Sequence, residues 1–145
     1  NWFFRQRKKR QAAQEIENTQ KKAYALIGTT HLGSAIHVAG HPLLQRDQLI
    51  VLALVEEQLN IYSYDNSAPL DSILLKNIKL IHTVVYDDDR TPHIDVIDSA
   101  AQALQIAFDW QEQPCTCLFR RMRKMKPIDW YHAIQRNRLQ YGLAT

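Results

Sequence analysis

Glycine, proline and cysteine are scarce in this sequence, whose 145 residues include only 4, 5 and 2 of them, respectively. Such low glycine and proline contents exclude a fibrous or low-complexity chain, and two cysteines do not indicate a disulfide framework. No apolar run approaches the roughly 18–20 residues that a membrane-spanning helix needs. The composition is 46% hydrophobic and 23% charged, which predicts one folded domain with a core and excludes wholesale disorder.

Acidic residues are scarce at both ends of the chain, and the net charge of +3 conceals this partition. Residues 1–22 carry a net charge of +5, residues 23–115 carry −8, and residues 116–145 carry +6. A nucleic-acid-binding face would spread Lys and Arg over the folded surface. An acidic middle between basic ends therefore argues against nucleic acid as a partner.

The N-terminus places three aromatic residues, Trp2, Phe3 and Phe4, directly before a dense group of cations. We call this group the N-terminal basic cluster: Arg5, Arg7, Lys8, Lys9 and Arg10. The order is typical of the cytoplasmic end of a transmembrane helix, and the first residue is Asn rather than Met. We therefore expect an upstream membrane helix and a cluster that contacts the anionic cytoplasmic face of the membrane. The alternatives are a trimmed tag, a soluble cytoplasmic protein, or an amphipathic helix whose cations face water.

Residues 5–27 lack proline and glycine and are rich in good helix formers, which predicts a helix that stops before Gly28. Its apolar positions form only a thin stripe: Ala12, Ile16, Ala23 and Leu26. Such a helix packs weakly, links a membrane to a domain, or pairs with a second copy in a self-associating scaffold. We predict a basic juxtamembrane helix or linker over residues 1–22 and a folded domain over residues 23–145.

From about residue 48 the hydrophobic pattern changes from helical to extended. The segments predicted as strands are residues 49–55, 59–64, 70–75 leading into 78–86, 94–96, 104–110 and 115–119. Short polar turns separate these segments, which predicts an antiparallel sheet. The last segment carries Cys115, Cys117 and Phe119 on one side, so both cysteines are predicted to be core residues rather than half of a zinc site.

The clearest helix follows this sheet. Pro127 suits its first turn, and Gly142 suits its end. Trp130, Ala133, Ile134 and Tyr141 share one face, and the large indole ring of Trp130 would fasten the helix to an apolar surface.

Six or seven short strands followed by a helix bearing Trp130 and Ile134 resemble the pleckstrin-homology-like superfamily, which includes the GRAM-type domains, over roughly residues 23–141. The chain resembles a bacterial-type or otherwise divergent member of this superfamily. The resemblance implies an α+β fold with a bent antiparallel barrel of about seven strands. The C-terminal helix would close one end of that barrel, with Trp130 and Ile134 as its structural cap, and the N-terminal helix would precede it. Residues 127–135 are similar to the family's capping helix, and residues 59–61 and 104–108 are similar to its paired strands.

The resemblance implies a non-enzymatic adaptor that binds membranes, phosphoinositides or peptides. In lipid-binding members, cations between the first two strands grip inositol phosphates. That loop, about residues 37–48, offers only Arg46 with His37 and His41. A protein or peptide partner is therefore favoured over a specific phosphoinositide.

A second basic cluster lies between the last strand and the final helix: Arg120, Arg121, Arg123, Lys124 and Lys126. Together with Met122 and Met125, these cations would suit an anionic lipid or an acidic segment of a partner. The alternative is a solvated connection.

No residue pattern predicts a catalytic or metal site. Asp87, Asp88 and Asp89 lack the spacing of an EF-hand loop and suit a solvated turn. His31 and His41 have no recognised nucleophile or orienting carboxylate at a suitable spacing. We predict no enzymatic activity, metal or cofactor.

Overall fold

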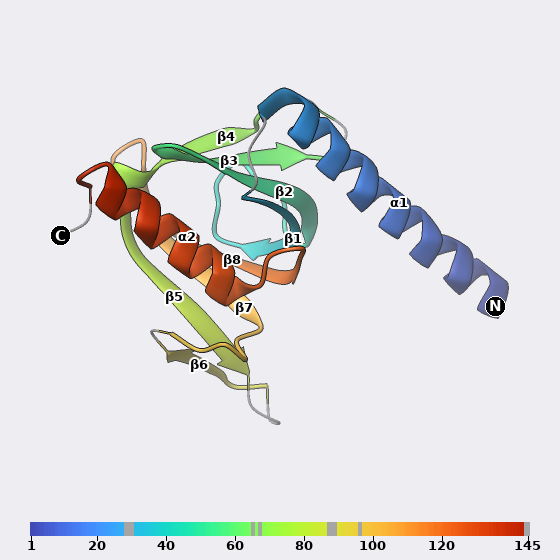
Figure 1. The fold of residues 1–145 in the computed structure, drawn as a ribbon. Helices are drawn as coiled ribbons and strands as arrows, with labels where there is room; N and C mark the ends of the chain where they lie inside the picture. The colour runs from blue at the N-terminus through green and yellow to red at the C-terminus, as the bar shows by residue number, and fades with distance from the viewer. Residues whose placement is uncertain (28–30, 65, 67, 87–89, 96, 144–145) are drawn as a thin grey trace.

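The computed structural model describes residues 1–27, 31–64, 66, 68–86, 90–95 and 97–143, without the side chains of residues 16, 17, 19–27 and 95. Its elements, in chain order, are two α-helices, eight strands and one 3₁₀ turn (Figure 1). They are α1 (Trp2–Ile27), β1 (Leu32–Ala39), β2 (Gln48–Val55), β3 (Gln58–Ser63), β4 (Asp71–Leu74), the 3₁₀ turn η1 (Leu75–Asn77), β5 (Ile78–Tyr86), β6 (Pro92–Asp95), β7 (Ala103–Trp110), β8 (Gln113–Arg123) and α2 (Pro127–Gln140).

The eight strands form one antiparallel sheet in the order β4-β3-β2-β1-β8-β7-β5-β6. The predicted α+β class and antiparallel pairing are confirmed. The expected barrel is wrong in closure, because β4 and β6 are edge strands that do not pair with each other. The strand number is eight, against the predicted number of about seven. The strand predicted from residue 70 is interrupted by η1, which separates β4 from β5.

Strand β1 is the element that the hydrophobic pattern misses, since the sheet begins at Leu32 rather than near residue 48. Two glycines weaken the strand signal, yet the pairing of β1 with β8 requires them. A Cβ at Gly33 would lie 2.6 Å from the carbonyl oxygen of Arg123, and a Cβ at Gly40 would lie 1.8 Å from that of Thr116. These glycines allow the backbones of β1 and β8 to approach closely.

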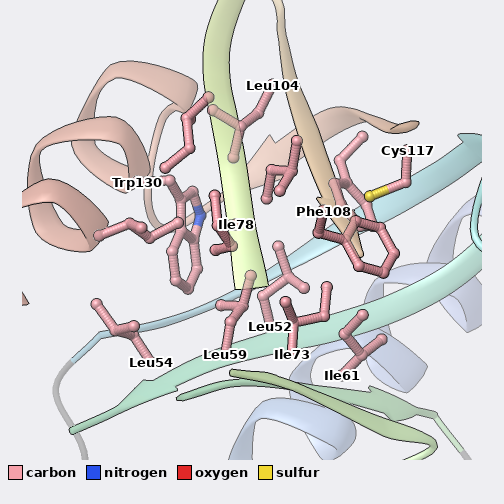
Figure 2. Packing of buried hydrophobic residues seen from close by; sticks show 14 of the residues in the cluster. Leu52, Leu54, Leu59, Ile61, Ile73, Ile78, Leu104, Phe108, Cys117 and Trp130 are labelled. Atoms are coloured by element: carbon pink, nitrogen blue, oxygen red, sulfur yellow. The ribbon is translucent and has the colours of Figure 1, made fainter. Parts of the chain in front are cut away.

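The main core lies between the sheet and α2 (Figure 2). Trp130 and Ile134 are fully buried in it, and Cys117 and Phe119 of β8 contribute from the same cluster. The prediction of a core cysteine is confirmed for Cys117, whereas Cys115 is half-buried and packs against that cluster. Both thiols are free.

Helix α2 starts and ends as the sequence predicts. Pro127 lies in its first turn, and the Asp129 carboxylate accepts a hydrogen bond from the backbone N–H of Lys126 at 2.9 Å. At its other end, the Asn137 side chain donates to the Glu56 carbonyl at 2.9 Å, and Arg138 donates to the Ile78 carbonyl at 3.3 Å. These two bonds hold α2 to the β2–β3 turn and to the start of β5.

Helix α1 is a single helix of 26 residues that begins three residues earlier than predicted and continues past residue 22, the expected domain boundary. It contacts β1 and β2, and its N-terminal end projects away from the sheet (Figure 1). The side chains of Ile16, Ala23 and Leu26 lie outside what the structure describes, so the predicted apolar stripe stays a prediction. Within the described residues, no helix is both long and apolar enough to cross a membrane.

Candidate functional site

The projecting end of α1 exposes both the aromatic residues and the N-terminal basic cluster. The exposed fractions of Trp2, Phe3 and Phe4 are 66%, 75% and 62%. All five cations of the cluster are exposed as well. Asn1 caps the first turn, because its side-chain oxygen accepts the Phe3 N–H at 2.9 Å. Trp2, Phe3 and Phe4 therefore belong to the helix itself, directly before the cations.

The charges of α1 oppose its dipole. The first turn contains no acidic residue and the last turn contains no basic one, whereas the N-terminal cluster lies within the first ten residues. A helix N-terminus carries a partial positive charge and favours anions. The order of charges along α1 is therefore the reverse of the one that a helix dipole favours.

The second basic cluster was predicted to lie between the last strand and the final helix, but three of its five cations lie on the end of β8: Arg120, Arg121 and Arg123. Only Lys124 and Lys126 lie on the connection to α2, and all five cations are exposed. The guanidinium of Arg120 lies 4.6 Å from the centroid of the Tyr86 ring, a cation–π contact within the sheet. Met122 and Met125 are half-buried and pack against the main core. Part of each methionine side chain remains accessible, so the expectation that they join the cations at a contact surface stays a prediction.

A buried pair of histidines, His37 and His41, occupies the β1–β2 region. His37 and His41 are only 1% and 3% exposed. Nε2 of His41 lies 2.7 Å from Oδ2 of Asp71 on β4, and the His41 ring stacks on Phe108 with centroids 5.4 Å apart. The expectation that no carboxylate orients His41 is wrong, because the pairing of β4 with β3 brings Asp71 to it.

The hydrogen bonds fix the tautomers of both rings. The backbone N–H of His41 donates to Nε2 of His37 at 3.1 Å, so Nδ1 of His37 carries the proton and donates to the Gln45 carbonyl at 2.8 Å. The backbone N–H of Leu43 donates to Nδ1 of His41 at 3.1 Å, so Nε2 of His41 donates to Asp71. Every ring nitrogen is occupied, which leaves none to act as a general base.

Burial lowers the pKa of His41, and it outweighs the opposing hydrogen bond and charge of Asp71. Neutral His41 also suits the geometry, since a proton on Nδ1 would displace the Leu43 N–H. Burial raises the pKa of Cys117, which leaves its thiol protonated and unreactive. The chemistry of this region is thus structural: it fixes the β1–β2 loop against β4 and β7.

The remaining sequence candidates are the aspartate run and a metal site. Asp87, Asp88 and Asp89 lie outside the described residues. Where the structure describes side chains, no group of three or more His, Cys, Asp or Glu is placed to hold a metal ion. The β1–β2 loop falls within the predicted residues 37–48, and its only Lys or Arg is the exposed Arg46.

No known protein family, curated protein or solved structure matches this chain in the comparisons.

Proposed function

We propose that this chain is a non-enzymatic, membrane-proximal interaction domain with a pleckstrin-homology-like fold. Its N-terminal helix contacts the anionic cytoplasmic face of a membrane, and its folded body binds a protein or peptide partner. The observation that carries the proposal is the projecting end of α1. There, three exposed aromatic side chains adjoin five exposed cations, and no acidic residue occurs before Glu15.

The fold assignment is supported by strand order. Without β6, the sheet reads β4-β3-β2-β1-β8-β7-β5, seven antiparallel strands followed by a helix whose Trp130 and Ile134 fill the core. The resemblance likewise implies about seven antiparallel strands followed by a helix, whereas this sheet is open and has β6 added beside β5. The poverty of cations in the β1–β2 loop argues against a specific phosphoinositide pocket and favours a protein or peptide ligand for the body.

The expected binding free energy of the cations supports the membrane contact. Each Lys or Arg close to an anionic surface contributes about 1 kcal/mol before screening by salt. The five cations of the N-terminal cluster and the three adjacent aromatic rings therefore suffice for measurable, reversible binding.

Co-sedimentation with vesicles tests this contact through matched variants of the full chain. Arg7→Gln with Arg10→Gln removes two cations from the N-terminal cluster, and Arg121→Gln with Arg123→Gln removes two from the second cluster. We expect the first pair to weaken binding to phosphatidylserine vesicles by about ten- to thirtyfold, since two contacts of about 1 kcal/mol are lost. We expect the second pair to bind nearly as the unmodified chain does.

Two results would contradict the proposal. Equal binding to neutral and anionic vesicles would remove the electrostatic contact. A larger loss from Arg121→Gln with Arg123→Gln would move lipid recognition from α1 to the folded body.

The alternative function is a self-associating scaffold joined through α1. It is favoured by the exposure of residues 1–15, which leaves this half of the helix accessible to a second copy. The like charges of the N-terminal cluster oppose a parallel pairing at low salt. Sedimentation equilibrium separates the alternatives: a monomer at all concentrations excludes the scaffold, and a concentration-dependent dimer supports it.

A further inference from the structure

The N-terminal end of α1 separates its apolar and charged residues along the helix axis rather than between two faces. Successive residues turn by about 100°, so Trp2, Phe3 and Phe4 spread around more than half of the first turn. The five cations that follow are also distributed around the helix axis, and the angle between neighbouring cations is nowhere wider than about 100°. The exposure of residues 1–15, of which only Gln6 is half-buried, agrees with a helix end that has no packed face.

This axial order matters because the two ways of binding a bilayer need different patterns. A helix that lies in the membrane surface needs one apolar face and one polar face along its length. A helix that crosses the interface steeply needs apolar residues at one level along its axis and cations at the next level. The first ten residues of α1 have the second pattern, since any face turned toward the lipid would also carry a cation.

We propose that α1 meets an anionic bilayer end-on, with Trp2, Phe3 and Phe4 in the interface and the N-terminal basic cluster as a ring in the headgroup layer. This inference rests on the membrane contact proposed above. In this orientation the axis of α1 is steeply inclined to the membrane surface, and the helix holds the folded body away from the lipid.

Dimensions support this orientation. One helical turn rises about 5.4 Å, which suits the depth of about 5–10 Å that interfacial residues reach. The cluster extends over residues 5–10, a rise of about 7.5 Å, which is comparable to the headgroup layer.

Site-directed spin labelling of the full chain tests the orientation. A nitroxide is placed at residues 3–14 in turn, in a Cys115→Ser and Cys117→Ala background whose fold is checked by circular dichroism. Each variant is bound to phosphatidylserine vesicles, and its depth is measured from collisions with oxygen and with a water-soluble nickel complex. We expect depth to decrease steadily by about 1.5 Å per residue along the chain.

The outcomes distinguish this inference from the membrane contact on which it rests. Depth that oscillates every 3.6 residues would mean a helix lying flat, and it would overturn the orientation while leaving the contact intact. Binding without immersion of any label would also overturn the orientation. Failure to bind vesicles at all would overturn the membrane contact itself, and the orientation with it.

An exchange of two residues gives a second, independent readout. Phe3→Gln with Gln6→Phe keeps composition and charge but moves one aromatic ring from the tip to the level of the cations. End-on entry predicts weaker vesicle binding for this variant. Stronger binding would contradict it, because residues 2 and 6 share a helix face and would together favour a flat helix.

Discussion

At the residue scale, the neutral state of His41 links stability to pH. Burial holds its pKa below the ordinary value of 6.5 in the folded chain, so the unfolded chain takes up the proton more readily as pH falls below that value. The stabilisation is fully present above about pH 6.5 and is lost as pH falls through the folded pKa. We expect the free energy of unfolding to decrease over this range, by at most about 1.4 kcal/mol per pH unit for one proton.

Urea denaturation at several pH values, with matched variants, measures the contribution of His41. His41→Gln is expected to unfold more easily at neutral pH, because its bonds to Asp71 and Leu43 change, and to lose part of the acid-dependent slope. His132 is exposed on α2, so His132→Gln should leave the slope close to that of the unmodified chain. An unchanged slope in His41→Gln would show that its titration does not govern acid stability.

The contact between His41 and Asp71 could not be predicted from the sequence. The two residues are 30 positions apart, and they meet only because β4 pairs with β3 in a register that sets Asp71 opposite Ile61. No local spacing encodes that register. The burial of Cys117 and Trp130, in contrast, follows from alternation along one strand and from one helical face, and both were predicted.

At the element scale, predictability depended on local signals. Helix α2 carries a proline in its first turn, an apolar face and a glycine stop, so its bounds were predicted closely. Strand β1 carries Gly33 and is followed directly by Gly40, and the small size of both residues is required by β8 rather than by β1 itself. Sheet openness was beyond prediction for a related reason, since closure depends on whether the edge strands β4 and β6 reach each other.

Substitution of Trp130 tests how much the packing of α2 against the sheet contributes to stability. Its ring is fully buried, and its indole N–H has no hydrogen-bond partner in the described part of the chain. Trp130→Ala should destabilise the fold by about 3–5 kcal/mol through the cavity it leaves. Trp130→Phe should cost clearly less, because an aromatic ring remains and no hydrogen bond of the indole is lost. Urea denaturation followed by circular dichroism measures both values.

Trp2 supplies the matched control for this pair. It is 66% exposed, so Trp2→Ala should leave the free energy of unfolding within about 0.5 kcal/mol of the unmodified chain. Equal losses in Trp130→Phe and Trp130→Ala would mean that the indole N–H, rather than the volume of the ring, supports the packing of α2.

At the scale of the whole molecule, salt should separate the function of α1 from the stability of the folded body. The N-terminal basic cluster is exposed and concentrated, and screening weakens its attraction to an anionic surface once the Debye length falls below about 10 Å. The body is held mainly by its apolar core and its sheet. Its exposed ion pair of Lys79 with Asp109, at 3.3 Å, is of a kind that contributes only about 0–1 kcal/mol.

We therefore expect vesicle binding to fall steeply when NaCl rises from about 0.05 M to about 0.5 M, over which screening becomes short-ranged. The free energy of unfolding should change by less than about 1 kcal/mol over the same range. Vesicle co-sedimentation and urea denaturation in identical buffers give the two curves. If both fell together, salt would be acting on the fold, and the lost binding would reflect unfolding. If neither fell, the aromatic residues rather than the cations would carry the membrane contact, because apolar burial is not screened.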